Sequence, residues 1–302
     1  PTRGSEVNVK KARLQSLSLN NISAVSPMNF DEAINLAASG DFKILSGGTD
    51  LMIELRKSSD PQKILNVFGL NELKAITETK TDVRIGSAVP FTQITGNSVM
   101  NKYFPMLISA CSKIGSLQVR NRGTIAGNLV NAAPCADSFP PLIAYGASVV
   151  LTSSKGKRTF PVEEFIVKNY ETVIRKDEIL TEIIIPKPTE DFKLSYFKLG
   201  RRNALNITRL SIGVLMSFKR QKIKNCIIVA GSLFHKPGRI SQIEELLNGK
   251  ELSDKLINSI EEPLKEIIKN EIGGRWSSEY KIPVFINMCK DALNNLKKQV
   301  KI

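Results

Sequence analysis

Two short segments of small residues carry the features that an anion-binding turn needs. The first is Ser46-Gly47-Gly48-Thr49-Asp50, which directly follows a short apolar run. A phosphate is bound by several backbone N–H groups directed at one point, and glycine lets the backbone approach closely and adopt positive φ. Thr49 adds a hydroxyl, and Asp50 can cap the helix that we expect from Leu51 onward. Most Gly-Gly pairs are simple turns or caps, so this segment alone does not identify a phosphate site.

The second segment is Gly123-Thr124-Ile125-Ala126-Gly127-Asn128, a glycine loop that again offers a hydroxyl and an amide. The stretch from Asn131 to Asp137 continues it with small and polar residues, as suits a chain pressed against a flat ligand; a tight surface loop has the same composition. Neither segment matches GxGxxG and GxxxxGK[ST] is absent, so a Rossmann dinucleotide domain and a P-loop NTPase are not supported. Two anion-binding loops in one domain suit a ligand with a pyrophosphate and two ends, such as a dinucleotide.

The supply of histidine and cysteine excludes several other kinds of chemistry. The single histidine, His235, disfavours His-rich metal sites and Ser-His-Asp catalysis. The four cysteines form no CxxC pair or other clustered spacing that would bind zinc or an Fe–S cluster: Cys111, Cys135, Cys226 and Cys289. Scattered cysteines in a long, lysine-rich chain are typical of a cytoplasmic protein with free thiols. We therefore expect no metal site, and chemistry that depends on a bound group rather than on a protein nucleophile.

The size and charge of the chain set wider limits. It has 302 residues and a formal charge of +14, from 43 Lys+Arg against 29 Asp+Glu, which fits a globular protein of two domains with a basic surface. No stretch approaches the ~18 consecutive apolar residues of a membrane span. The basic residues are dispersed and only 6% of residues are aromatic, so a nucleic-acid stacking platform is not indicated. A solvated lysine-rich surface, a face for an acidic partner and attraction of an anionic cofactor stay open as interpretations.

The elements that must position the two segments follow from hydrophobic periodicity and helix caps. Residues 1–21 are polar, basic and without periodicity, which predicts a tail or linker. The first segment lies between a predicted strand and a predicted helix, and the second lies between two predicted helices. The helices are expected at Asp31–Ala37 (with Asn29 as N-cap), Leu51–Leu55, Tyr103–Ile114 and Asp137–Tyr145, and the strands at Lys43–Ser46, Lys63–Val67, Val83–Ala88, Ala147–Thr152 and Glu178–Ile185.

A boundary is predicted between Pro186 and Asp191, where prolines end the last of these strands. The segments that follow have the composition of an antiparallel sheet: Ser195–Leu199, Ser211–Phe218 and Cys226–Ala230. The last part of the chain is predicted to be helical, at Ile240–Leu247, Leu252–Lys269 (with a break or kink at Pro263) and Tyr280–Val300. The chain is thus predicted to be an α+β protein in two parts.

Several of these segments together resemble one known family. Ile44 to Leu51 is similar to the first FAD loop, and Gln118 to Asn128 to the second FAD loop, of the FAD-carrying (medium) subunits of the molybdenum hydroxylases, such as bacterial xanthine dehydrogenase and carbon monoxide dehydrogenase. Further similar segments occur in the same order along the chain: Arg84 to Ile94, Asp177 to Leu180, Tyr196 to Lys198 and Gly274 to Tyr280. The two loops together are specific for this family, although each alone is not.

The resemblance implies a fold, domains and an electron path. Residues 22–188 would form a two-subdomain FAD-binding unit of the vanillyl-alcohol-oxidase (PCMH) type, with subdomains over about 22–78 and 79–188. Residues 189–302 would form a small α+β domain with a three-stranded antiparallel sheet and helices. Electrons from the molybdenum-cofactor subunit would pass through a [2Fe-2S] subunit or domain to this FAD, and then to NAD or another acceptor. The chain would be a cytoplasmic oxidoreductase subunit without a role for nucleic acid or a membrane span.

The resemblance also implies roles for individual residues. The first loop would hold the pyrophosphate, with Leu45, Ser46, Gly47, Gly48, Thr49, Asp50 and Leu51. The other cofactor-binding residues would be Ala88, then Thr124, Ala126, Gly127 and Asn128 along the phosphate and flavin, Asn131 and Asp137 near the flavin or ribityl chain, and Leu180 and Lys198 against the isoalloxazine ring. A cation there would offset the negative charge that flavin gains on reduction. Without the resemblance, Lys198 would be interpreted as a surface lysine.

One residue departs from the family pattern, and two rival functions stay open. The family usually has two glycines in its second loop, whereas this chain has Ala126 before Gly127. Alanine penalises positive φ, so either this position has an ordinary φ or the loop is shifted. The first rival is a stand-alone FAD-dependent oxidase or reductase of the same fold. The second is a non-catalytic basic protein that binds nucleic acid or an acidic partner.

Overall fold

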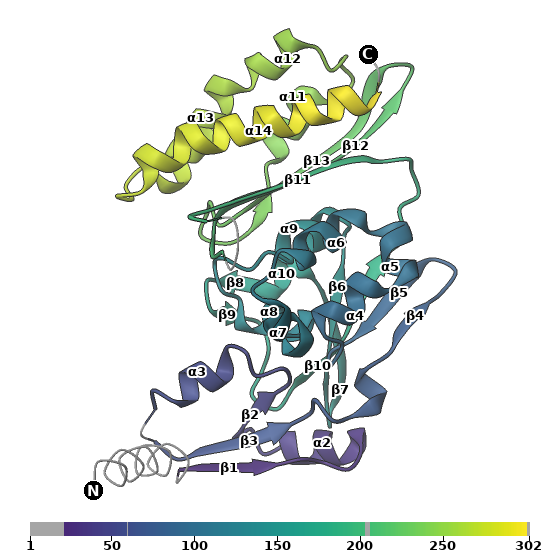
Figure 1. Cartoon of the computed structure of the whole chain (residues 1–302), viewed down its shortest axis with the longest axis vertical. Helices are drawn as coiled ribbons and strands as arrows, with labels where there is room; N and C mark the ends of the chain where they lie inside the picture. Colours follow the sequence, from purple (N-terminus) through teal and green to yellow (C-terminus); the bar gives the residue numbers. More distant parts are fainter. Residues whose placement is uncertain (1–20, 59, 203–205, 301–302) are drawn as a thin grey trace, which may run out of the picture.

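The structure is a computed structural model that describes residues 21–58, 60–202 and 206–300 (Figure 1). The tail predicted for residues 1–21 lies, apart from Asn21, outside the described residues. The strands are β1 (Ile22–Val25), β2 (Phe42–Leu45), β3 (Gln62–Asn66), β4 (Ile76–Glu78), β5 (Asp82–Gly86), β6 (Ser148–Ser153), β7 (Gly156–Pro161), β8 (Ile166–Lys168), β9 (Glu171–Thr172), β10 (Ile179–Pro186), β11 (Lys193–Gly200), β12 (Thr208–Lys219), β13 (Lys222–Gly231) and β14 (Gly238–Arg239). The helices are α2 (Phe30–Ala37), α3 (Leu51–Leu55), η1 (Asn71–Leu73), α4 (Phe91–Gly96), α5 (Ser98–Tyr103), α6 (Pro105–Ser112), α7 (Leu117–Arg122), α8 (Ile125–Asn131), α9 (Phe139–Ala144), α10 (Val162–Phe165), α11 (Ser241–Leu247), α12 (Asp254–Ser259), α13 (Glu261–Ile272) and α14 (Ser278–Val300).

Besides the two-stranded pair β8-β9, three larger sheets of the described residues follow one another from the bottom to the top of Figure 1. The first is parallel with the order β1-β3-β2, and the second is antiparallel with the order β4-β5-β10-β6-β7. The third is antiparallel with the order β11-β12-β13-β14, and so has one strand more than predicted, because the two-residue β14 pairs with β13. This arrangement is the α+β architecture predicted from the sequence.

The small parallel sheet carries the first glycine segment at the end of β2. Helix α2 crosses between β1 and β2, and it begins as predicted at Asn29, whose Oδ1 accepts a hydrogen bond from the backbone N–H of Glu32 at 2.9 Å. Ala33, Ile34 and Ala37 of α2 are buried against this sheet. The first glycine segment therefore begins at the end of a strand whose sheet is held by α2, and this packing fixes the position of its glycines.

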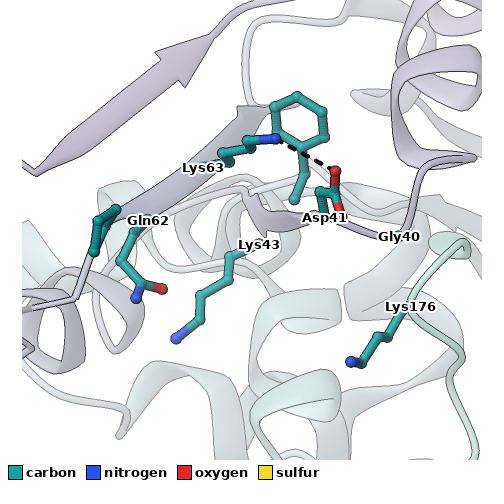
Figure 2. Close-up of a pocket in the computed structure, with 8 residues that line it drawn as sticks. Gly40, Asp41, Lys43, Gln62, Lys63 and Lys176 are labelled. Atoms are coloured by element: carbon teal, nitrogen blue, oxygen red, sulfur yellow. Dashed lines mark hydrogen bonds and ion pairs between the residues drawn. The ribbon is translucent and has the colours of Figure 1, made fainter.

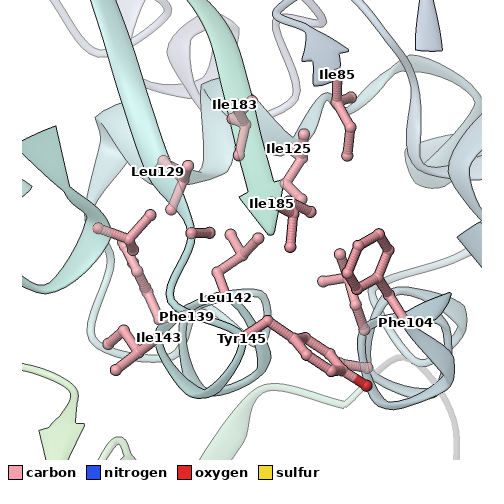
Figure 3. Packing of buried hydrophobic residues seen from close by; sticks show 14 of the residues in the cluster. Ile85, Phe104, Ile125, Leu129, Phe139, Leu142, Ile143, Tyr145, Ile183 and Ile185 are labelled. Atoms are coloured by element: carbon pink, nitrogen blue, oxygen red, sulfur yellow. The ribbon is translucent and has the colours of Figure 1, made fainter. Parts of the chain in front are cut away.

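The middle sheet supports helix α8, which contains most of the second glycine segment (Figure 3). Ile183 and Ile185 of β10 are two residues apart, so both point to the same face of the sheet. Ile125 and Leu129 of α8 are fully buried in the same core, together with Leu142 of α9. The apolar side of α8 is thus anchored on β10, and its glycine side is left for other contacts.

The C-terminal sheet is covered on both faces, which explains why almost all of β12 is buried. Leu215 belongs to the core of the middle region, together with Tyr196 of β11. Ile212 and Val214 of β12 pack instead against helices α11 to α14. Because side chains of a strand alternate between faces, one face of this sheet is brought against the middle region and its functional residues.

Two of the differences from the sequence prediction concern helices near predicted landmarks. The second glycine segment is not a loop, since residues 117–122 and 125–131 form helices α7 and α8. The predicted break at Pro263 is also wrong, because the helix is interrupted at Ile260 and Pro263 lies in the first turn of α13. Proline is tolerated there, since the first N–H groups of a helix have no intrahelical partner to lose.

None of the described helices is both long and apolar enough to cross a bilayer. The described residues also contain no group of three or more His, Cys, Asp or Glu side chains arranged to hold a metal ion. All four cysteines lie in the described part of the chain as free thiols, and of these Cys135 is half-buried while the other three are buried.

Candidate functional site

The two predicted segments are in direct contact, although 78 positions separate them in the sequence. The hydroxyl of Thr124 donates a hydrogen bond to the hydroxyl of Ser46, with 3.3 Å between the oxygens. A Cβ atom at Gly47 would lie 2.0 Å from the carbonyl oxygen of Arg122 and 2.9 Å from Cα of Gly123. Only glycine fits at position 47, because the neighbouring atoms belong to the backbone and cannot move aside cheaply.

The first turn, residues 46–51, presents a row of free backbone donors. Among the described residues, no protein acceptor is found for the N–H groups of these positions. Gly48 has φ +77°, a left-handed conformation that favours glycine and lets the chain turn sharply into α3. Asp50 does not cap α3 through its side chain, contrary to the prediction, and desolvation raises the pKa of its carboxyl. The turn is therefore an open set of N–H groups of the kind that binds an anion.

The second segment is a helix start rather than a loop. Thr124 is the N-cap of α8, and its hydroxyl accepts a hydrogen bond from the N–H of Gly127 at 3.1 Å. Ala126 and Gly127 lie inside α8 and neither has a positive φ, so alanine is accommodated at position 126 without strain. The departure from the family pattern is thus explained by an ordinary helical φ. Asn128 accepts a hydrogen bond from the hydroxyl of Ser138 at 2.7 Å, which fixes its amide.

The remaining predicted residues of these elements lie around the two segments. Ala88 is fully buried, and its N–H donates to the carbonyl of Leu73 at 2.8 Å. Asn131 ends α8 and is followed by Ala132, whose φ of 45° reverses the chain toward the segment that leads to Asp137. Leu180 of β10 is buried in the core on which α8 packs.

A second cluster, made of side chains, surrounds Asp137. The ammonium of Lys198 donates to Oδ2 of Asp137 at 2.6 Å, and the hydroxyl of Thr208 donates to Oδ1 at 2.6 Å. The hydroxyl of Tyr196 also donates to Oδ1, at 3.3 Å. Asp137 comes from the segment before α9, whereas its three partners come from β11 and β12. The cluster therefore joins the middle region to the C-terminal sheet.

The charges of this cluster are buried and balanced. The side chains of Lys198 and Asp137 are only 5% and 6% exposed, so each needs the other as a counter-ion. Burial raises the pKa of Asp137, and the charge and hydrogen bonds of Lys198 and the bonds from Thr208 and Tyr196 oppose this rise. Burial and the nearby Asp137 raise the pKa of Tyr196 well above its ordinary value, so the phenol stays protonated and donates. Lys198 is thus an anchored, paired cation rather than a surface lysine.

Cys135 connects the first turn with this cluster electrostatically. Burial is the main cause of the raised pKa of its thiol, and the carboxylates of Asp137 and Asp50 add to the rise while Lys198 opposes it. The thiol is therefore close enough to Asp50, Asp137 and Lys198 to be influenced by all three charges. The backbone half and the side-chain half of the predicted site therefore face one region.

The described residues line two cavities, of which one adjoins the cluster around Asp137. A cavity of about 590 Å³ adjoins Lys198, and its lining contains several basic side chains and no acidic one: Ser112, Lys113, Gly115, Ser116, Leu117, Arg120, Lys198, Leu199, Gly200, Arg202 and Asn206. The other, about 430 Å³, is shown in Figure 2 and lies where β2 and β3 begin, at the end of those strands opposite the first turn. It contains none of the predicted site residues, and its Lys63 is paired with Asp41 at 3.3 Å.

Comparison with known families agrees with this geometry. Residues 20–188 match the family described as the FAD binding domain in molybdopterin dehydrogenase, and residues 195–296 match the CO dehydrogenase flavoprotein C-terminal domain. The chain belongs to this family. It is an FAD-binding oxidoreductase subunit of the molybdenum hydroxylase type, and the resemblance predicted from the sequence is confirmed.

Individual relatives of this FAD-binding subunit are similar over most of their length. The xanthine dehydrogenase FAD-binding subunit of Escherichia coli O157:H7 is 29% identical over 267 residues, which cover 87% of this chain and 91% of that protein. The glyceraldehyde dehydrogenase medium chain of Sulfolobus acidocaldarius is 30% identical over 262 residues, which cover 86% and 92%. The solved Cu,Mo-CO dehydrogenase has a chain of the same fold, with a TM-score of 0.84, 23% identity and coverage of 92% of this chain and 98% of that one.

The residues of this FAD-binding subunit fit the cofactor of its family. The free N–H groups of residues 46–51 match the need of a diphosphate, and the close approach of Gly47 to Arg122 keeps the turn in place. Thr208 and Cys135 were not predicted as members of the site, and Tyr196 was predicted only as part of a segment similar to the family. The hydroxyl of Thr208 gives no signal in the sequence, since only the register of β12 brings it to Asp137.

Proposed function

We propose that this subunit holds FAD across the first turn and helix α8, takes electrons from the [2Fe-2S] clusters of a partner subunit, and passes them to an acceptor, with NAD as the first candidate. The observation that carries the proposal is the contact between Ser46-Gly47 and the connection from α7 to α8, which brings free N–H donors and small residues together. A diphosphate between two larger groups is the ligand that such a surface recognises.

The roles of the site residues follow from where they lie. The N–H groups of the first turn, between Leu45 and Leu51, bind the diphosphate. Helix α8 and its N-cap line the cofactor with Thr124, Ala126, Gly127 and Asn128, and Ala88 is a further cofactor-binding position. Asn131 and Asp137 lie toward the ribityl chain and flavin, and Leu180 and Lys198 lie against the ring.

The chain binds and orients the flavin and does no acid–base chemistry of its own. Bound FAD supplies the redox chemistry. The small side chains at positions 126 and 127 let the backbone approach the cofactor closely. The anchored pair of Asp137 and Lys198 gives the ring a fixed polar environment that needs no rearrangement during electron transfer.

A partner that carries molybdenum cofactor and [2Fe-2S] clusters is supported by the relatives, which are named as subunits or medium chains of dehydrogenases. The surface also offers a place for a partner. Trp276 is 91% exposed and follows Arg275 in the chain. Burial, together with the charges of Arg275 and Arg209, lowers the pKa of Lys281. Exposed tryptophan and arginine are enriched in protein interfaces. Lys281 is linked through Ser232 to the carbonyl of Pro134, next to Cys135 of the site.

An anionic acceptor such as NAD is supported by the cavity beside Lys198. Lys113, Arg120 and Arg202 line it, and no acidic residue is found among its described lining. A nucleotide with phosphate groups suits a cavity of about 590 Å³ with this charge.

The domain division and the location are proposals of the same kind. We assign residues 22–188 to the FAD-binding domain, with subdomains 22–78 and 79–188, and residues 189–302 to the C-terminal domain; the two family matches support a division near this point. Strand β4 lies before position 79 but pairs with β5, so the subdomains share an edge. The four free thiols support a cytoplasmic location.

The proposal is tested on the purified subunit with two measurements. The absorption spectrum reports bound FAD, and anaerobic addition of NADH reports whether a nicotinamide nucleotide exchanges electrons with it by bleaching the flavin bands. We expect yellow protein that NADH bleaches. Lys113→Glu should raise the Kd for NADH about tenfold, because it reverses a charge at the cavity. Lys219→Glu, at the far end of β12, makes the same charge change away from the site and should leave the Kd unchanged.

The outcomes separate the parts of the proposal. Colourless protein that FAD does not restore would reject flavin binding. Yellow protein that does not respond to NADH would keep the flavin site and reject NAD as the acceptor. Turnover of a simple substrate by the isolated chain, without partner subunits, would favour the stand-alone flavoenzyme instead.

A further inference from the structure

Thr208 is the first residue of β12 and is the most closely bonded neighbour of Asp137 apart from Lys198. Its side chain is 5% exposed, and its hydroxyl lies 2.6 Å from Oδ1 of Asp137. Tyr196 reaches the same oxygen at a longer distance, 3.3 Å. Lys198 occupies the other oxygen, Oδ2. The carboxylate is therefore held on both sides, with Thr208 as the main donor to Oδ1.

Lys198 is held in turn from two directions. Its ammonium donates to Asp137 at 2.6 Å and to the backbone carbonyl of Lys113 at 3.0 Å. The position of the ammonium thus depends on the position of the carboxylate. Since Thr208 fixes that carboxylate, a substitution at Thr208 affects the position of the Lys198 ammonium indirectly, through Asp137.

We propose that Thr208 is a positioning residue of the flavin site: its hydroxyl keeps Asp137 oriented and ionised, so that Asp137 and Lys198 present a fixed pair without net charge to the flavin. The inference rests on the proposed function, which places this pair against the ring. It concerns a residue on the C-terminal sheet, outside both glycine segments, and gives that sheet a part in tuning the cofactor.

The physical reason is the balance between burial and hydrogen bonding. Burial favours the neutral form of a carboxyl, and hydrogen bonds donated to it favour the ionised form. The other titratable groups around Asp137 are Lys198 and Tyr196 on β11, Cys111 on α6 and the nearby Cys135. Both thiols have a raised pKa and stay neutral near pH 7, as does the phenol of Tyr196. Asp137 is therefore the member of the cluster whose charge the loss of Thr208 would change.

Without the Thr208 hydroxyl, Asp137 takes up a proton at a higher pH than in the native protein. Lys198 then carries an unbalanced positive charge, which favours the reduced flavin because that form is more negative. A lost hydrogen bond to a charged group changes the proton affinity of Asp137 by about tenfold, which corresponds to about one pH unit.

The test compares the midpoint potential of the FAD-loaded subunit between pH 6 and 9 in three variants. Thr208→Val keeps the shape and removes the donor, so its potential should become more positive, and the pH dependence of the potential should be displaced upward by about one pH unit. Thr208→Ser keeps the donor and should behave as the native protein. Thr152→Val, a matched control, removes another buried threonine hydroxyl, bonded to Thr181 in the middle sheet, and should not move the potential.

Two further variants test whether Thr208 acts through Asp137 and through its ability to donate a hydrogen bond. Asp137→Asn should show the raised potential at every pH, and adding Thr208→Val to it should have no further effect. If Thr208→Val fails to fold, Thr208→Cys, a poor donor, must raise the potential where Thr208→Ser does not. An unchanged potential in stable, FAD-loaded Thr208→Val or Thr208→Cys overturns this inference and leaves the flavin site intact. Native protein that binds no FAD overturns the proposed function and this inference together.

Discussion

The two halves of the proposed flavin site differ in the kind of atoms that hold them together. The first turn and the start of α8 meet through backbone atoms, as the distance of 2.0 Å between a Cβ at Gly47 and the carbonyl oxygen of Arg122 makes plain. The cluster around Asp137 meets through side chains, with three donors on one carboxylate. The backbone half depends on shape, and the side-chain half depends on charge balance.

This difference decides what each half tolerates. A backbone contact leaves no room for one added carbon, whatever its polarity, because the chain itself must move. A buried ion pair tolerates replacements of similar volume but not the loss of one partner, since the other then remains charged in a dry environment. An added methyl group should therefore disrupt the backbone half, whereas the side-chain half should be disrupted by the loss of one charge rather than by a small change in volume.

Gly47→Ala should have the largest effect, because it tests the backbone half at its tightest point. Inserting a methyl group into a packed site costs about 1–3 kcal/mol and more where backbone blocks it. We expect a cost at the upper end of this range, and at least a tenfold loss of FAD affinity as the turn shifts away from α8. Thermal unfolding and the flavin content of the purified protein measure both effects.

The matched control for that change is Gly69→Ala, a glycine with open space around its Cβ position and no positive φ. It should keep full flavin content and gain or lose less than about 1 kcal/mol of stability. Equal behaviour of the two alanine variants would show that the contact at Gly47 does not constrain the turn.

Lys198→Met tests the side-chain half by leaving Asp137 without its counter-ion. Removing one partner of a buried pair costs about 3–5 kcal/mol at a pH where the other stays charged. Burial already raises the pKa of Asp137 in the native protein, so without Lys198 this carboxyl takes up a proton rather than remain charged and unpaired. When a carboxyl has a higher pKa in the folded state than in the unfolded state, the folded protein loses stability as the pH rises from the unfolded pKa, about 3.9, to the folded pKa.

The cost of Lys198→Met should therefore be larger at pH 8 than at pH 5, as urea denaturation at the two pH values would measure. The double variant Asp137→Asn with Lys198→Met removes both charges and should recover most of the loss at pH 8. A cost that does not depend on pH would contradict a charged pair.

The sequence predicted the shape-dependent half better than the charge-dependent half. The turn after β2 was predicted because glycine, hydroxyl and strand signals lie next to one another. The same emphasis on glycine produced the error at α8, where Thr124 as N-cap and the buried Ile125 and Leu129, four positions apart, indicate a helix. The N-cap and the apolar spacing thus indicated a helix, but the glycines and small residues of the segment led to the prediction of a loop.

The charge-dependent half could not be predicted in full from the residues. Tyr196 and Thr208 lie 59 and 71 positions from Asp137, and a polar residue on a strand gives no sign of its partner before the sheet is placed. Short elements such as β14 were also missed, since two residues carry no periodicity. Resemblance to the family supplied Asp137 and Lys198, and the structure supplied the residues that hold them.

Glu190→Gln should have the smallest effect, and it asks whether the side-chain half depends on how the C-terminal sheet is attached. Glu190 lies in the connection from β10 to β11 and accepts hydrogen bonds from Lys224 at 2.8 Å, Asn225 at 2.7 Å and the hydroxyl of Ser217. The bond from Lys224, followed by that from Ser217, lowers its pKa to about 2. The connection is thus tied to β12 and β13 by an ionised carboxylate.

A carboxyl whose pKa is depressed by folding stabilises the protein above its unfolded pKa, 4.5, and this contribution is lost as pH falls toward 2. Native protein should therefore unfold at a higher temperature than Glu190→Gln at pH 7, and the gap should close as the pH approaches 2. Asp191→Asn, a change at the neighbouring residue whose side chain is 86% exposed, should show no such gap. Because no hydrogen bond joins the turn at residues 46–51 to this connection among the described residues, the Glu190→Gln variant should keep its FAD affinity. A loss of FAD affinity equal to that of Gly47→Ala would mean that the two halves fold as one unit and that the distinction between them does not hold.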